Sequence, residues 1–187
     1  HNLSPAATIS KYLKETDPNC KVVFIGPCTA KKMEFQKPEV RPYIDSVMTF
    51  EELQALIDSR DIEVETLEEG VLDNASYYGR IFARSGGLTD AVRQALKEQG
   101  LEDFPYDPIA CDGIEACRLA LLKASKGILP NNFIEGMACE NGCVAGPAAI
   151  LPVQRVLKNR EKLMKTADER TILENLEKHD FSGVEME

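Results

Sequence analysis

Histidine is almost absent from this sequence. The 187 residues contain two histidines, His1 and His179, and both stand near the ends of the chain among polar residues. Histidine-based nucleophilic catalysis and histidine-rich metal sites both need an imidazole ring that the fold holds in place. The sequence therefore argues against either kind of site.

Long apolar runs and basic clusters are also missing. No apolar run approaches the ~20 residues of a membrane-spanning helix, so we expect no membrane span. Acidic residues outnumber basic ones by 31 to 22, and the net charge is -9. Nucleic-acid-binding proteins usually present a basic face, whereas the densest basic stretch here is Lys31-Lys32, with Glu34 close behind. We therefore expect no nucleic-acid partner and, with no export signal visible, a cytoplasmic location.

Cysteine is sparse. Six cysteines in 187 residues are too few for a disulfide scaffold. We expect reduced thiols, each of which is either a small buried side chain or a ligand of a metal or cluster.

What is present is typical of a globular α/β protein, with 43% hydrophobic and 28% charged residues. Short apolar runs such as KVVFIG (21–26), SVMTF (46–50) and PIACDG (108–113) alternate with amphipathic helical patterns. This alternation predicts an α/β fold with mostly parallel short sheets flanked by helices. The length suits one domain or two tightly joined lobes over residues 1–187, and we place the junction of two lobes within 79–108.

Local signals place several helices. Ser4-Pro5 predicts a helix start, and Thr49 with Glu52 forms the pattern of a capping box. Residues 61–87 indicate a loop with weak strands. Residues 147–163 indicate a mostly helical segment that Pro152 kinks or restarts.

Cysteines follow two of the predicted strands. Cys28 comes directly after KVVFIG, and Cys139 and Cys143 come after FIEGM. Functional groups of α/β folds gather at the carboxyl ends of strands, and thiolates bind iron–sulfur clusters. Three thiols are one short of a complete set. By spacing alone Cys111 and Cys117 can supply a fourth ligand, or both can be buried structural thiols.

Two further features of the sequence each allow two interpretations. Lys31 and Glu34 are either an exposed charged pair or a cationic donor, with its partner, beside an anionic cluster. Ser85-Gly86-Gly87 precedes a predicted helix, so it is either an anion-binding helix start or a plain loop.

The two cysteine segments resemble signatures of the iron-only (FeFe) hydrogenases. PCTAKKMEF resembles the second signature, Pro-Cys-x-x-Lys-x-x-Glu, through Pro27, Cys28, Lys31 and Glu34. EGMACENGCVAG resembles the third, Glu-x-Met-x-Cys-x-x-Gly-Cys-x-x-Gly, and its matching residues are Glu135, Met137, Cys139, Gly142, Cys143 and Gly146. Two signatures in the family's order make the resemblance specific.

The resemblance implies a cofactor. Cys28, Cys139 and Cys143 would be ligands of a 4Fe-4S cluster, and Cys143 would also bridge to a two-iron subsite that carries CO and cyanide. Together these form the family's H-cluster, at which two protons and two electrons combine reversibly to H2. A ferredoxin or another redox protein would be the electron partner.

The resemblance also implies roles for other residues. Lys31 would donate a hydrogen bond to a cyanide of the two-iron subsite, and Met137 would pack against that subsite. Glu34 and Glu135 would support the cofactor loops. Ser4 would match a serine of the family's proton route.

The sequence departs from the family at three places. The first signature, Thr-Ser-Cys-Cys-Pro, is absent, so residues 1–187 would be the C-terminal portion of the catalytic domain and an upstream segment would supply the fourth ligand. Gly26 stands where the family has Met, and Ala145-Gly146-Pro147 replaces the last glycines of the third signature. We expect the isolated piece to be inactive, and its cluster content stays open.

These departures suit a divergent, sensory branch. The rival hypothesis is a hydrogenase-like iron–sulfur sensor or cluster-assembly protein without H2 turnover. An α/β domain with buried thiols is the third possibility.

Overall fold

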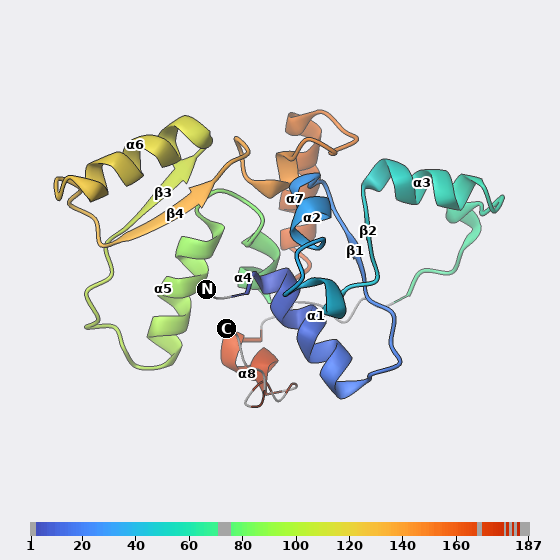
Figure 1. Ribbon diagram of the computed structural model, residues 1–187, viewed down its shortest axis with the longest axis horizontal. Coiled ribbons are helices and arrows are strands. Elements are labelled where there is room, and N and C mark those ends of the chain that lie inside the picture. The colour runs from blue at the N-terminus through green and yellow to red at the C-terminus, as the bar shows by residue number, and fades with distance from the viewer. Residues whose placement is uncertain are drawn as a thin grey trace. The chain divides into compact units, whose positions relative to one another are not determined.

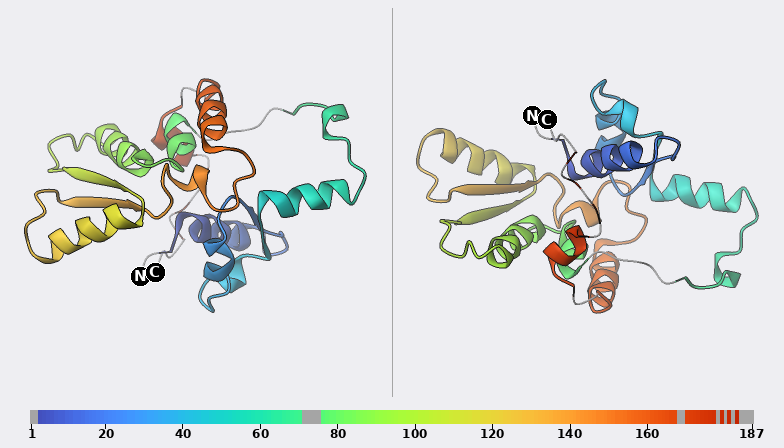
Figure 2. Two further views of the ribbon diagram at one scale, coloured as in Figure 1. Left: turned by 90° about the horizontal axis from the view of Figure 1, so that it is seen from above. Right: turned by 90° about the horizontal axis from the view of Figure 1, so that it is seen from below.

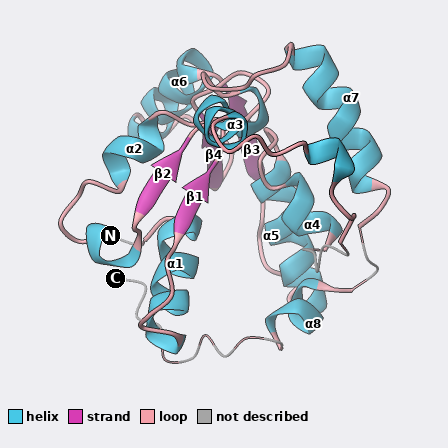
Figure 3. Ribbon diagram, turned by 90° about the vertical axis from the view of Figure 1, so that its right-hand side faces the viewer, coloured by secondary structure: helices cyan, strands magenta, loops and turns pink. Residues whose placement is uncertain are grey.

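Two pairs of short parallel strands organise the chain, and helices accompany each pair (Figures 1 and 3). The computed structural model describes residues 3–70, 76–167, 170–177, 179, 181 and 183. The contacts within the chain divide it into two units. The first comprises residues 1–70, 147–150 and 180–187, and the second comprises residues 71–146 and 151–179.

The first unit is built on the strand pair β1 (Val23–Ile25) and β2 (Ser46–Met48), in which Phe24 lies opposite Val47. Its helical elements are α1 (Pro5–Thr16), α2 (Ala30–Glu34), the 3-10 turn η1 (Arg41–Tyr43), α3 (Phe50–Asp58) and the 3-10 turn η2 (Val64–Thr66). Ala7, Phe35, Val40 and Ile44 form its buried core. Helix α1 thereby packs against the segment that joins the two strands.

Both predicted helix starts of the first unit are confirmed. The Ser4 hydroxyl accepts a hydrogen bond from the Ala7 amide at 3.3 Å and caps α1. Thr49 and Glu52 form a complete capping box, because the Thr49 amide donates to the Glu52 carboxylate at 2.8 Å and the Glu52 amide donates to the Thr49 hydroxyl at 3.3 Å. These caps fix the first residues of α1 and α3.

The second unit is built on β3 (Pro108–Asp112) and β4 (Phe133–Met137), in which Cys111 lies opposite Gly136. Its helices are α4 (Tyr77–Ile81), α5 (Gly87–Glu98), α6 (Ile114–Ser125), α7 (Val153–Met164) and α8 (Ile172–Leu176), and η3 (Cys143–Ala145) is a 3-10 turn. Helix α6 is the crossover between the strands and covers one face of the pair, while α5 lies on the other (Figures 1 and 2). The predicted α/β fold with short parallel sheets is confirmed.

Two local predictions need correction. Within residues 61–87 the sequence prediction missed α4, which forms because the Ser76 hydroxyl caps it by accepting from the Gly79 amide at 3.4 Å and because Ile81 is fully buried. Residues 71–75 lie outside the described residues. The helix predicted after Pro147 begins only at Val153, since Pro152 is its N-cap.

The predicted lobe junction at 79–108 lies inside the second unit, whereas the first division between the units falls after Gly70. Helices α4 and α5 and strand β3 contact one another within that range. The single domain over 1–187 and its junction stay predictions. No helix in the described part of the chain is long and apolar enough to cross a membrane.

Candidate cofactor site

In the first unit, Cys28 lies at the carboxyl end of β1, as the sequence predicts. The Gly26 amide donates to the Met48 carbonyl at 3.1 Å and extends the strand pairing by one residue. A Cβ atom at position 26 would lie 3.0 Å from the Phe24 ring, so this ring fills the room beside Gly26. The chain then turns at Pro27, and the half-buried Cys28 stands just before α2.

Lys31 and Glu34 are part of a half-buried network in the first unit. The Glu34 carboxylate accepts hydrogen bonds from the Lys31 ammonium and the Ser4 hydroxyl. The Lys31 ammonium also lies 3.4 Å from the Ser4 oxygen and 5.7 Å from the centre of the Phe35 ring. The side chains of Lys31 and Glu34 are 22% and 25% exposed, so they do not form a fully solvated pair.

This network changes the acidity of Glu34. Partial burial raises the pKa of Glu34, but the hydrogen bonds from Lys31 and Ser4 outweigh that effect and leave the pKa below its ordinary value. Glu34 therefore stays an anion near neutral pH and holds the Lys31 ammonium at the start of α2. In this way the three residues tie the N-terminus of α1 to the Cys28 segment.

In the second unit, the third-signature loop brings Cys143 next to Met137. Strand β4 ends at Met137, and the chain turns through Asn141 and Gly142, which both have a positive φ angle. The Cys143 Sγ lies 4.0 Å from the Met137 Sδ. Cys139 is half-buried and Cys143 is exposed, so neither thiol is locked in the core. The loop thus places a thioether and an accessible thiol side by side.

Segment 81–87 supports this loop. The Val144 amide donates to the Ala83 carbonyl at 3.2 Å. Gly142 packs directly on the same segment, because a Cβ at position 142 would lie 2.5 Å from the Ala83 oxygen and 2.6 Å from the Ser85 nitrogen. On the other side of the loop, the Asn141 amide donates to the Asp112 carboxylate at 2.8 Å.

Glu135, within β4, is buried, with 2% of its surface exposed. Its carboxylate accepts hydrogen bonds from the Gly86 amide at 2.8 Å, the Thr89 amide at 2.8 Å and the Thr89 hydroxyl at 2.6 Å. The Ser85-Gly86-Gly87 segment therefore does meet an anion at the start of α5, and this anion is a side chain of the same unit.

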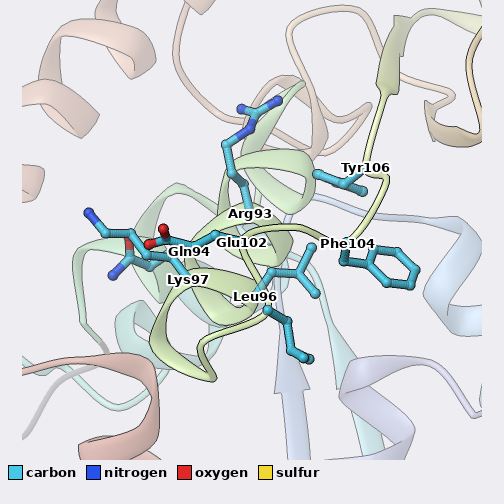
Figure 4. A pocket seen from close by; sticks show the side chains of 8 residues that line it. Arg93, Gln94, Leu96, Lys97, Glu102, Phe104 and Tyr106 are labelled. Atoms are coloured by element: carbon cyan, nitrogen blue, oxygen red, sulfur yellow. The ribbon is translucent and has the colours of Figure 1, made fainter.

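Thr89 also accepts a hydrogen bond through its backbone carbonyl. The Tyr106 hydroxyl donates to the Thr89 carbonyl at 3.2 Å, and burial raises the pKa of Tyr106. Tyr106 lines a pocket of about 400 Å³ together with Arg93, Phe104 and other residues of α5 and the loop that follows (Figure 4). The Arg93 guanidinium lies 5.7 Å from the centre of the Tyr106 ring.

Cys111 and Cys117 are structural thiols in this arrangement. Cys111 is 3% exposed, and burial raises the pKa of its thiol. The Cys117 Sγ points to backbone carbonyls, 3.6 Å from the Met137 oxygen and 3.8 Å from the Cys111 oxygen. Gly136 makes room for this sulfur, since a Cβ there would lie 3.2 Å from it. Cys111 is thus buried and Cys117 half-buried against the backbone, and these surroundings favour structural thiols over cluster ligands.

The chemical type of the three candidate ligands, which are all cysteine thiols, fits an iron–sulfur cluster. Cys28 in the first unit and Cys139 and Cys143 in the second are thiols that stand at strand ends outside the buried cores, and thiolates are the usual ligands of such clusters. Within the described residues, no three His, Cys, Asp or Glu side chains gather as a metal ion would require. The predicted ligand set therefore stays a prediction, divided between the two units.

The family follows from a comparison with known proteins. The family model described as "Iron only hydrogenase large subunit, C-terminal domain" matches residues 1–147. The chain belongs to this hydrogenase family. Iron hydrogenase 1 of Clostridium pasteurianum is 31% identical, in a match that covers 68% of this chain and 28% of that protein.

Further relatives extend the comparison. The periplasmic [Fe] hydrogenase large subunit of Nitratidesulfovibrio vulgaris is 28% identical over 66% of this chain and 37% of that protein. The nuclear prelamin A recognition factor of Rattus norvegicus is 24% identical over 66% of this chain and 35% of that protein. The hydrogenase-family chain thus spans between 28% and 37% of the length of these relatives.

Solved structures show the same fold. An [FeFe]-hydrogenase studied for oxygen inactivation has a TM-score of 0.62 and 20% identity, over 91% of this chain and 60% of that one. An [FeFe]-hydrogenase of Chlamydomonas reinhardtii has a TM-score of 0.59 and 20% identity, over 85% of this chain and 57% of that one. The short parallel strand pairs and their helices are therefore those of the hydrogenase fold.

Proposed function

We propose that this chain is the C-terminal part of a catalytic domain that, in the full-length protein, interconverts protons and electrons with H2. The observation that carries the proposal is the contact between Cys143 and Met137 at the end of β4, with 4.0 Å between their sulfur atoms. The resemblance assigns both residues to the two-iron subsite. Their proximity supports the proposal because they are six positions apart, so the loop between them must fold back for them to meet.

In this proposal Cys28, Cys139 and Cys143 would hold the 4Fe-4S cluster, and Cys143 would also carry the two-iron subsite. When bound, the H-cluster would supply the electron transfer and the site at which protons are reduced. The chain's own residues would hold and orient it. Lys31 would offer a cationic donor, and Ser4 and Glu34 would keep its ammonium in place.

The proposal includes partners. An upstream segment of the same protein would supply the fourth ligand, and a ferredoxin or another redox protein would deliver electrons in the cytoplasm. The isolated 187-residue chain would then be inactive, because a ligand set of three thiols leaves one iron of a cubane without a protein ligand.

A second candidate is an iron–sulfur sensor or cluster-assembly protein without H2 turnover. The Phe24 ring favours it, because it fills the room beside Gly26 where the family carries the side chain of a methionine. Pro147 also favours it, because it stands where the family has one of the last glycines of the third signature.

The test uses the full-length protein, matured anaerobically with the cluster-assembly machinery. We expect H2 evolution with a strong reductant and infrared bands of iron-bound CO and cyanide. Cys143→Ser should reduce H2 evolution to background. The control is Cys20→Ser, because Cys20 lies outside both signatures and its sulfur lies 3.5 Å from the Leu13 carbonyl.

Each outcome separates the candidates. H2 evolution that Cys143→Ser abolishes and Cys20→Ser keeps would support the hydrogenase. A 4Fe-4S signal in electron paramagnetic resonance, without H2 or the infrared bands, would support the sensor or assembly protein. A protein that takes up no iron at all would contradict both.

A further inference from the structure

The buried carboxylate of Glu135 is connected to Cys143 by a short series of contacts. Both of its oxygens are engaged, one by the Gly86 amide at 2.8 Å and the other by the amide and hydroxyl of Thr89 at 2.8 and 2.6 Å. With 2% of its surface exposed, Glu135 is closed off from solvent, and its oxygens bind residues of the same unit. Its hydrogen bonds therefore give Glu135 a route to the site through the residues it binds.

Those residues belong to the segment on which the third-signature loop is seated. Gly86 directly follows the Ala83–Ser85 backbone, on which Gly142 packs. The Val144 amide donates to the Ala83 carbonyl at 3.2 Å. Cys143 lies between Gly142 and Val144, so both of its chain neighbours are fixed by the segment that Glu135 holds.

The chemistry of this contact calls for a carboxylate of this length. Two amides and a hydroxyl all donate to Glu135, and the start of the twelve-residue helix α5 adds the positive end of its dipole. A glutamine would turn an NH2 group toward one of these donors, and an aspartate would be one methylene too short to reach both. Neither of these substitutions preserves all three hydrogen bonds.

We propose that Glu135 is a positioning residue that fixes Cys143 by anchoring residues 83–89 through its hydrogen bonds to Gly86 and Thr89. The inference rests on the proposed function only in taking Cys143 as a cluster ligand. The anchor itself is a property of the second unit, and it can be measured whether or not a cluster is bound.

The first experiment measures amide hydrogen exchange by NMR in the 187-residue chain. A buried hydrogen bond to a charged group is strong enough to change an opening equilibrium about tenfold or more. We expect Glu135→Gln to speed exchange about tenfold or more at Gly86 and Thr89, and also at Val144, whose amide donates to the Ala83 carbonyl and not to Glu135. The matched control is Glu140→Gln, an exposed carboxylate of the same loop, which should leave all three amides unchanged.

Thr89→Val provides a milder change, because it removes the hydroxyl bond of 2.6 Å and keeps both amide bonds to Glu135. It should give the same pattern with a smaller increase. If Glu135→Gln unfolds the whole unit, the Thr89→Val pattern decides the question. Faster exchange at Gly86 and Thr89 with no change at Val144 would overturn the proposal, since Glu135 would then only stabilise α5.

The second experiment uses the full-length protein with its cluster. Glu135→Gln should keep the iron content and shift the electron paramagnetic resonance lines of the reduced 4Fe-4S cluster, and Glu140→Gln should not. Unshifted lines despite faster Val144 exchange would refute the effect on Cys143. A wild-type protein that binds no cluster would contradict the proposed function. The exchange experiment would still test whether Glu135 holds residues 83–89 in place.

Discussion

Gly142→Ala is the substitution that most directly tests how the third-signature loop is seated. Gly142 has φ 83° and ψ -174°, a region that is essentially restricted to glycine and costs other residues about 1–3 kcal/mol. The new Cβ would also lie 2.5 Å from the Ala83 oxygen, a backbone atom. Forcing such an overlap typically costs about 1–3 kcal/mol more. We therefore expect a total loss of about 2–6 kcal/mol from the free energy of unfolding.

Gly127→Ala is the matched control within the second unit. Gly127 also has a positive φ, 67°, but a Cβ there would meet nothing within 4 Å. This control carries the cost of the left-handed backbone, about 1–2 kcal/mol, without the overlap. In urea unfolding followed by circular dichroism, where slopes are about 1–3 kcal/mol per molar, Gly142→Ala should lower the midpoint by about 1 M more than the control. Equal midpoints would refute the seating of the loop on Ala83–Ser85.

Two further predictions concern the site residues. Because the pKa of Glu34 is lowered in the folded chain, its stabilising contribution is present above the ordinary value of 4.5 and is lost as the pH falls through the folded-state pKa. Urea midpoints at pH 7 and pH ~3.5 should differ less in Glu34→Gln than in the wild type, and an equal difference would contradict the network with Lys31 and Ser4. Cys111→Ala should cost about 1 kcal/mol of stability and leave the iron content of the full-length protein unchanged; a loss of iron would make Cys111 a ligand after all.

Local signals in the sequence were sufficient for the elements that local contacts define. Ser4 and Thr49 cap their helices through residues three positions away, so the pattern alone locates both starts. The parallel pairing of β3 with β4 follows from the helix between them. Helix α4 was missed because Gly79 interrupts its pattern, and its five residues are held by the Ser76 cap and the burial of Ile81.

Within the site, the sequence located the loops but not their supports. The two signatures identify Cys28 and the Cys139–Cys143 loop, and the structure places both at strand ends. Glu135 binds Gly86, which is 49 positions away in the sequence, and Thr89, which is 46 positions away. No periodicity or spacing in the sequence predicts contacts over such separations. The glycine pair at 86–87 was the available hint, since an anion-binding helix start was one of its two interpretations beside a plain loop.

The hydrogen bond from the Ala148 amide to the Pro27 carbonyl, 3.1 Å long, has a consequence for how the chain is made. These residues belong to the same unit, yet the ribosome synthesises residues 71–146 of the second unit between them. At about 5–20 residues per second, the Cys28 segment waits some seconds for this partner. Cys139 and Cys143 emerge before it arrives. A nascent chain therefore contains Cys28, Cys139 and Cys143 before the backbone around Cys28 acquires this hydrogen bond.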